Sequence, residues 1–168
     1  KEIDLAFMAG YHYIAEKNPD GRSYQEFLDK ALEEIANLRQ GNPNLAFHYE
    51  YVPMKARNLE AKTLAAIGDA IESFGINENE IKLVLDDFNF TEEKKALEAS
   101  ERAFTLYKAA LPILRKMNLM RLHVHNLGYY VVIISKSYHI SPERCREACL
   151  YASCVNALKA KYGGFALA

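Results

Sequence analysis

The sequence predicts an α/β fold, a single domain over residues 1–168 in which a mostly parallel sheet lies between two layers of helices (αβα). Three observations predict it. Strand-like and helix-like segments alternate along most of the chain. The first strand-like segment, residues 3–10, is apolar on both faces apart from Asp4, as in a strand that helices cover on both sides. Half of the residues are hydrophobic, which is enough for an independent core.

The first half of the chain contains a predicted helix and a predicted strand with clear limits. Ser23 and Glu26 have the spacing of a capping box, so a helix should begin there and run to about Gln40. Residues 45–52 alternate as a strand does, and this alternation places His48 and Glu50 on the same face.

The second half contains more helix than strand. Thr91 should cap a long helix that Pro112 kinks or divides, and Ser141 should start the last helix, which Gly163-Gly164 ends. The other predicted elements are, in order, a helix over 58–73, a short strand over 74–76, a helix over 77–85, and two strands over 120–125 and 129–135 joined by a tight turn.

Composition excludes several classes of protein. The 21 basic and 22 acidic residues give a net charge of -1, so we expect neither nucleic acid nor a membrane surface as a partner. No apolar run reaches the roughly 18 to 20 residues that span a bilayer. Cys145, Cys149 and Cys154 fit neither a disulfide framework nor a zinc site, so we expect them to pack in the core of a cytoplasmic protein.

Polar residues stand at the predicted strand ends, where ligands bind in parallel α/β folds. They occur in residues 48–50, 77–80 and 123–126. Each stretch also has a purely structural interpretation. Asn77 and Glu80 have the spacing of a capping box, His48 and Glu50 suit a solvated pair on an edge strand, and residues 123 and 125 suit hydrogen-bonded core histidines.

Taken in order, these stretches resemble a known family. His48-Tyr49-Glu50, then Arg57, then residues 75–80, then Arg121 to Tyr130 resemble the HxE, NxxE and RxHxHTxGYY elements of the ADP-dependent sugar kinases. These are the glucokinase and phosphofructokinase family of the ribokinase-like superfamily, and the resemblance covers essentially the whole chain. It implies a ribokinase-like fold and transfer of the β-phosphoryl group of ADP to fructose 6-phosphate or glucose, with release of AMP.

The resemblance also implies a magnesium site. Glu50, Glu80 and Asn77 would hold Mg²⁺ mostly through its water shell, which suits an ion that prefers oxygen ligands and keeps several waters. Arg57 would stabilise phosphate charge, because phosphoryl transfer depends on cationic groups around the transferred group. A solvent-facing arginine on a helix surface is the alternative for Arg57.

Other residues are assigned to the two substrates by the same resemblance. His125, Asn126 and Gly128 would line the nucleotide site, although Asn126 stands where the family usually has threonine. His12, after the first strand, would contact the sugar, and an ordinary turn histidine is the alternative.

One family element is missing from the sequence. The catalytic base of the family is the aspartate of a GxGD element, and the only Gly-Asp step, Gly68-Asp69, lies inside a predicted helix. We therefore expect residues 1–168 to be part of the large nucleotide-binding domain of a longer kinase. An N-terminal part, a lid domain and a C-terminal GxGD segment would come from the rest of that chain, and this segment alone should be inactive.

Two other functions fit parts of the pattern. An ATP-dependent ribokinase-like sugar kinase would prefer ATP to ADP, but it accounts less well for the HxE element and the histidine-rich strand. A non-catalytic α/β nucleotide-binding module would bind nucleotide without dependence on magnesium.

Overall fold

The fold is seen in a computed structural model that describes residues 3–163. The chain divides into two compact units, Lys1–Ser135 and Lys136–Ala168. The prediction of a single domain over residues 1–168 is not tested by this division and stays a prediction.

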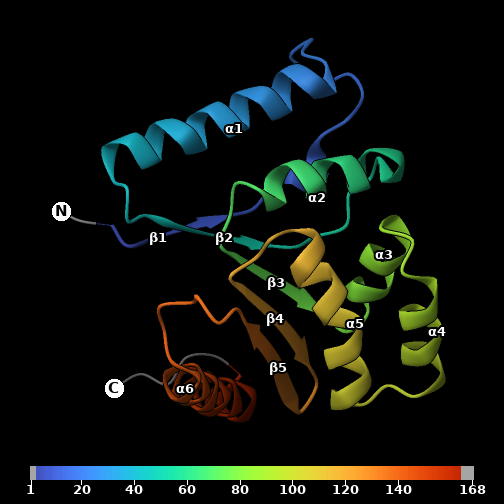
Figure 1. Cartoon of the computed structure of the whole chain (residues 1–168), viewed down its shortest axis with the longest axis vertical. Helices are drawn as coiled ribbons and strands as arrows, with labels where there is room; N and C mark the ends of the chain where they lie inside the picture. The colour runs from blue at the N-terminus through green and yellow to red at the C-terminus, as the bar shows by residue number, and fades with distance from the viewer. Residues whose placement is uncertain (1–2, 164–168) are drawn as a thin grey trace. The chain divides into compact units, whose positions relative to one another are not determined.

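The first unit is built on a five-stranded sheet with the order β1-β2-β3-β4-β5 (Figure 1). The first four strands are parallel, and β5 pairs with β4 in the antiparallel direction across a tight turn. The mostly parallel α/β fold is therefore confirmed. The strands are β1 Leu5–Met8, β2 Ala46–Glu50, β3 Ser73–Asn77, β4 Arg121–Asn126 and β5 Tyr129–Ile134.

Five helices connect these strands. Their buried side chains belong to one core cluster, which also contains alternate residues of the strands. The strands follow one another across the sheet in chain order, so right-handed crossovers carry the helices to the same face. This unit thus supplies the sheet and one helical layer. The helices are α1 Tyr24–Gly41, α2 Glu60–Gly68, α3 Glu80–Asp87, α4 Thr91–Ala99 and α5 Ala103–Lys116, with 3-10 turns η1 Tyr11–Tyr13 and η2 Arg57–Leu59.

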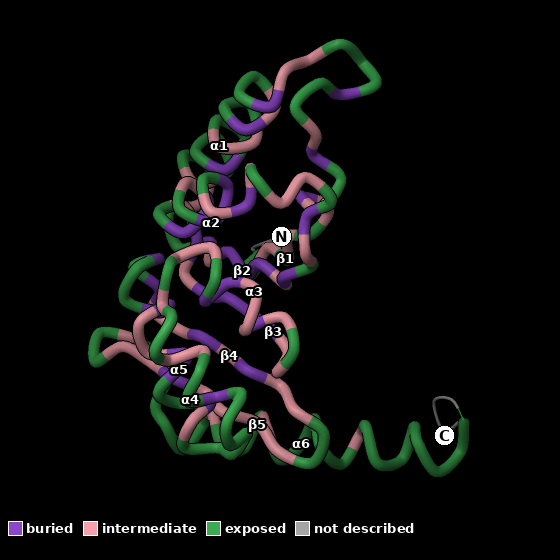
Figure 2. The backbone as a smooth tube through the Cα atoms, turned by 90° about the vertical axis from the view of Figure 1, so that its right-hand side faces the viewer, coloured by how far each residue is buried: buried purple, intermediate pink, exposed green. Residues whose placement is uncertain are grey.

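Alternation along the strands separates apolar from polar side chains. Figure 2 shows buried segments along the central strands. One face of these strands carries the apolar side chains of the core. The members on this face include Phe47, Tyr49, Phe74, Ile76, Leu122 and Val124. The opposite face carries His48, Glu50, Ser73, Gly75, Asn77, Arg121, His123 and His125. The chemistry-bearing residues therefore share a face that α1 to α5 do not occupy.

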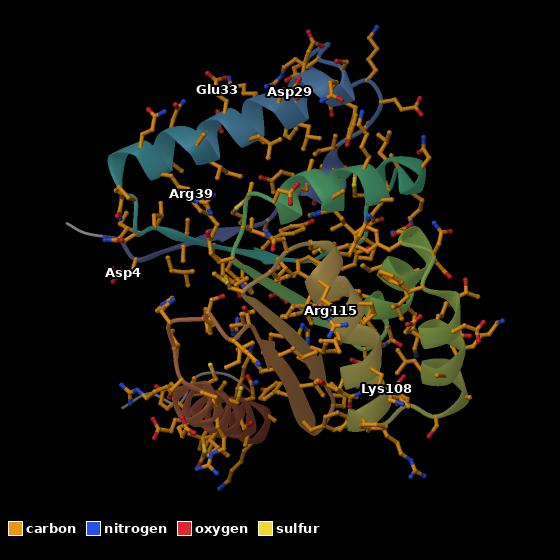
Figure 3. All side chains as sticks on the ribbon, viewed as in Figure 1. Asp4, Asp29, Glu33, Arg39, Lys108 and Arg115 are labelled. Atoms are coloured by element: carbon orange, nitrogen blue, oxygen red, sulfur yellow. The ribbon has the colours of Figure 1, made fainter. Side chains whose placement is uncertain are left out.

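Helix α1 follows the predicted pattern closely. Ser23 and Glu26 form a complete capping box at its start. Figure 3 shows Asp29 and Glu33 on its outer side and Arg39 on the side toward the sheet. Arg39 pairs with Glu72, which fixes the helix against the strands.

The predicted first strand is wrong in extent and in burial. Strand β1 covers only Leu5–Met8 and lies at the edge of the sheet. Leu5 and Phe7 are 54% and 66% exposed, because they lie on the same face of the sheet as His48, which α1 to α5 do not cover, whereas Ala6 and Met8 pack against the core.

The predicted long helix over residues 91–117 is in fact two helices, α4 and α5. The break follows Ala99, and the Thr105 hydroxyl accepts from the Arg102 amide to start α5. Pro112 lies inside α5 without dividing it. Thr91 is the first residue of α4 rather than its cap, because Phe90 holds that position.

The predicted helix over residues 58–73 also ends early, at Gly68. Gly68 packs against the backbone and Cβ of Met117, which leaves no room for a side chain. The strand β3 then starts at Ser73, one residue before the predicted strand.

The second unit contains one helix, α6 Pro142–Tyr162. The Ser141 hydroxyl accepts from the Arg144 amide at its start, and Gly163 ends it with a φ of 67°. Both limits were predicted, and Gly164 lies outside the described residues. All three cysteines lie on α6, but Cys145 and Cys149 are only half-buried and Cys154 is exposed, so the prediction that they pack in the core is wrong. None of the helices within residues 3–163 is long and apolar enough to cross a membrane.

Candidate active site

The site predicted from the sequence lies at the carboxyl ends of the parallel strands. Glu50 ends β2 and Asn77 ends β3, and His125 on β4 is paired with Asn77. His12 follows β1 in the turn η1. Because parallel strands end at the same edge of a sheet, the tertiary structure brings these residues from four strands to one rim.

The carboxylate of Glu50 is the centre of this rim. Its Oε2 lies 3.1 Å from His48 Nε2, and its Oε1 lies 3.1 Å from His125 Nε2. Burial would raise the pKa of Glu50, but the hydrogen bonds from His125 and His48 outweigh it and lower the pKa to about 2. The same contact with Glu50 raises the pKa of His125. Glu50 is therefore an ionised carboxylate held by two imidazoles.

Gly75 makes room for that carboxylate. It is the residue of β3 paired with Glu50, and a Cβ at this position would overlap Glu50 Oε2 and lie 3.1 Å from His48 Cε1. Sequence reasoning assigned no role to Gly75. The available signal was a glycine inside a strand, which often marks a close approach of another group.

Ser73 and Arg121, which the sequence analysis did not assign to the site, contact His48 on the side away from Glu50 or support that contact. His48 Nδ1 is 2.9 Å from Ser73 Oγ, and Arg121 Nη1 donates to the same oxygen at 2.9 Å. Both His48 and Ser73 are buried. The expected solvated pair of His48 and Glu50 on an edge strand is thus wrong, because β2 is an inner strand and His48 is enclosed.

Asn77 and Glu80 satisfy each other in a reciprocal cap. Asn77 Oδ1 accepts from the amides of Asn79 and Glu80, at 2.9 and 2.8 Å, and the Asn77 amide donates to Glu80 Oε2 at 3.0 Å. The structural interpretation of this stretch is therefore confirmed. Burial raises the pKa of Glu80, while the Asn77 amide and the nearby His125 oppose that shift and Glu50 adds to it.

Arg57 lies in an ion-pair cluster. Its guanidinium donates to the carboxylates of Glu60 and of Asp87, the latter at 2.7 Å, and to the Tyr51 hydroxyl at 3.2 Å. The Glu60 side chain is 0% exposed and also accepts from Tyr51 and the Met54 amide. The alternative of an ordinary solvent-facing arginine does not describe Arg57, because carboxylates of α2 and α3 hold its guanidinium, although the side chain is 39% exposed.

Asn126 and Gly128 lie at the β4–β5 hairpin. Asn126 Nδ2 donates to Glu101 at 3.2 Å, and Glu101 pairs with Lys82 at 2.7 Å. Gly128 has a φ of 98°, which the two-residue turn requires. The turn therefore explains the glycine at position 128 without any ligand.

His12 lies beside the start of the segment that follows β2. Its ring centroid is 3.9 Å from that of Tyr13, and its carbonyl accepts from the Lys55 amide at 3.3 Å. Its Nδ1 is buried and has no hydrogen-bond partner among the described residues.

The acidic residues do not form a direct metal cage. Within residues 3–163, no three His, Cys, Asp or Glu side chains are placed to hold one metal ion together. Glu50 and Glu80 nevertheless bring two carboxylates to the same rim, where they influence each other.

Residues 1–164 match the protein family described as the ADP-specific Phosphofructokinase/Glucokinase conserved region. The chain belongs to this family. Among related proteins, the ADP-specific phosphofructokinase of Methanosarcina acetivorans is 26% identical over 96% of this chain and 33% of its own length. The ADP-dependent glucose/glucosamine kinase of Pyrococcus furiosus is 25% identical over 97% of this chain and 34% of its own.

Solved structures of ADP-dependent kinases share the fold of this family member. A reconstructed last common ancestor of ADP-dependent phosphofructokinases from Methanosarcinales has a TM-score of 0.89 and 31% identity over 97% of this chain. An ADP-dependent kinase in complex with fructose-6-phosphate and ADPbetaS gives the same TM-score and identity, and the match covers 97% of this chain and 36% of that kinase. The ribokinase-like assignment is thus confirmed. The chain spans about a third of the length of these relatives.

Proposed function

We propose that this chain is part of an ADP-dependent kinase that transfers the β-phosphoryl group of ADP to fructose 6-phosphate and releases AMP. The observation that carries the proposal is the Glu50 carboxylate held between His48 and His125, beside the Asn77–Glu80 pair, at the carboxyl edge of a parallel sheet. Fructose 6-phosphate is preferred to glucose because most of the similar proteins named as ADP-specific are phosphofructokinases. Glucose is the alternative substrate.

Glu50 and Glu80, with Asn77, are proposed to hold Mg²⁺ through its water shell. The donor set fits such an ion, since an ionised carboxylate at Glu50 and an acidic oxygen at Glu80 face one rim, and a water-held ion needs no direct three-residue cage. When bound, Mg²⁺ neutralises charge on the diphosphate. The two imidazoles keep Glu50 ionised and fixed in place.

The remaining site residues are proposed in supporting roles. His125, Asn126 and Gly128 line the nucleotide side, and His12 contacts the sugar. Arg57 is proposed to act on phosphate charge, since its side chain is 39% exposed although Glu60 and Asp87 hold the guanidinium.

The rest of the kinase chain is proposed to complete the active site. The catalytic aspartate of a GxGD segment, the lid domain and an N-terminal part would come from outside residues 1–168, and the complete enzyme would work in the cytoplasm. Residues 1–168 would then belong to its large nucleotide-binding domain.

Calorimetry of the complete kinase with ADP, AMP and ATP, each with and without Mg²⁺, tests the proposal. ADP should bind more tightly with Mg²⁺ than without it, and fructose 6-phosphate should be phosphorylated at the expense of ADP. Preference for ATP would favour the ATP-dependent sugar kinase. Nucleotide binding that ignores Mg²⁺, without turnover, would favour the non-catalytic module.

Residues 1–168 alone provide the matching control. They should show no phosphoryl transfer from ADP, because the proposed base lies elsewhere. Measurable turnover by this segment would show that the assignment of the base is wrong.

A further inference from the structure

A chain of hydrogen bonds crosses three strands on the polar face of the sheet. Arg121 on β4 contacts Ser73 on β3 at 2.9 Å, Ser73 contacts His48 on β2 at 2.9 Å, and His48 contacts Glu50 at 3.1 Å. His48 and Ser73 are buried, so water does not readily replace these bonds.

The chemistry of these groups indicates which partner donates in each hydrogen bond of the series. A guanidinium only donates, so Arg121 occupies a lone pair of Ser73 Oγ. The hydroxyl proton of Ser73 is then available for His48 Nδ1. A neutral imidazole that accepts at Nδ1 carries its proton on Nε2, where it donates to Glu50 Oε2. With this tautomer, every bond from Arg121 to Glu50 points toward the carboxylate.

A second pair of contacts fixes the other side of that carboxylate. His125 holds Oε1 at 3.1 Å, and the missing side chain at Gly75 provides the recess in which the carboxylate lies. Both carboxylate oxygens are thus held, and the bond to Oε2 requires a proton on Nε2 of His48.

We propose that Ser73 and Arg121 are positioning residues that hold His48 in its Nε2–H tautomer and so fix the Glu50 carboxylate for its work at the active site. The tautomer of His48 depends only on the hydrogen bonds among these four residues. The consequence for magnesium rests on the function proposed above. Outer partners of this kind commonly change metal affinity by about 10- to 100-fold when they are removed.

The tautomer can be measured directly by ¹⁵N NMR of the complete kinase labelled at histidine, with His48 assigned by a His48→Gln variant. At pH 8, His48 Nδ1 should show the shift of an unprotonated nitrogen and Nε2 that of a protonated one. Ser73→Ala and Arg121→Met should both introduce the other tautomer, whereas Ser73→Thr, which keeps the hydroxyl, should not. Arg115→Met, which removes an exposed arginine from α5, is the matched control.

The second measurement is the Mg²⁺ concentration that gives half-maximal kinase activity. Ser73→Ala and Arg121→Met should raise it about tenfold, and Ser73→Thr and Arg115→Met should leave it unchanged. If Ser73→Ala does not fold, Arg121→Met decides both measurements.

Three results would overturn the inference. The first is an Nδ1–H tautomer in the unmodified kinase, and the second is an Nε2–H tautomer that persists in both variants. The third is a shifted tautomer with an unchanged Mg²⁺ requirement, which would remove the positioning role. A kinase without any Mg²⁺ dependence would overturn the proposed function instead, and the tautomer would still show whether the hydrogen-bond chain is correct.

Discussion

The Glu50 carboxylate lies over Gly75, its partner on the neighbouring strand, in space that any larger residue would fill. This contact joins β2 to β3 at the point where the predicted metal-binding residues meet. It explains why a glycine, which weakens a strand, stands in the middle of β3.

Gly75→Ala should therefore displace Glu50 from both histidines. We expect a loss of unfolding free energy of about 1 to 3 kcal/mol, because a methyl group is forced into filled space, together with weaker Mg²⁺-dependent binding of ADP. Urea unfolding and calorimetry measure the two effects. Gly41→Ala is the matched control, since a Cβ there meets nothing within 4 Å, and it should leave both quantities nearly unchanged. Normal binding in Gly75→Ala would mean that the position of Glu50 is unimportant.

Substitutions at Asn77 and Glu80 should distinguish a capping role from a metal-binding role. Asn77→Ala leaves the amides of Asn79 and Glu80 without their acceptor and should cost about 1 kcal/mol of stability. Glu80→Gln keeps an oxygen for the Asn77 amide but removes the charge, so stability should hold while Mg²⁺-dependent ADP binding falls. Unfolding curves and calorimetry on both variants provide the comparison. If Glu80→Gln binds normally, Glu80 is a cap alone.

Arg57 should contribute to the stability of the fold, in addition to its proposed role toward phosphate. Arg57→Met would leave the buried Glu60 carboxylate without its cation, and we expect a loss of about 3 kcal/mol. The same substitution in a Glu60→Gln background should cost clearly less, because the uncompensated charge is gone. Arg22→Gln, which breaks an exposed pair with Asp20, should have little effect. Equal costs in both backgrounds would contradict the coupling of Arg57 and Glu60.

The pH dependence of stability should reflect the histidines of β4. Burial, with a contribution from Arg121, lowers the pKa of His123 to about 4. Its contribution to stability is therefore complete above pH 6.5 and is lost as pH falls toward 4, since the unfolded chain takes up the proton first. His125 behaves oppositely, because its raised pKa gives stability below pH 6.5 that is lost at higher pH. The unfolding midpoint in urea, measured from pH 4 to 9, checks both trends.

Variants assign each trend to its residue. His123→Phe should remove the decline on the acidic side, because an apolar ring suits a site where Nε2 has no partner among the described residues. His125→Gln should remove the decline on the alkaline side. His139→Gln, at an exposed position, should change neither. An unchanged acidic decline in His123→Phe would assign it to other groups.

Much of the fold followed from local patterns. The capping box at Ser23, the alternation of residues 45–52, and the Ser141 start and Gly163 end of α6 each depend on nearby residues, and each was confirmed. The errors occurred where distant contacts decide. Gly68 ends α2 where Met117 packs against it, and Leu5 and Phe7 of β1 are exposed because they lie on the face of the sheet that the helices do not cover.

The site shows the same division. The sequence by itself determined which residue types stand at the strand ends, and that Glu50 shares a face with His48, because a strand alternates with a period of two. Only the tertiary structure decided that Glu50 lies between two histidines from different strands, that Gly75 makes room for it, and that Arg57 is held by Glu60 and Asp87. The physical reason is that strand pairing joins residues far apart in the chain, and the register of that pairing is set by packing across the whole sheet.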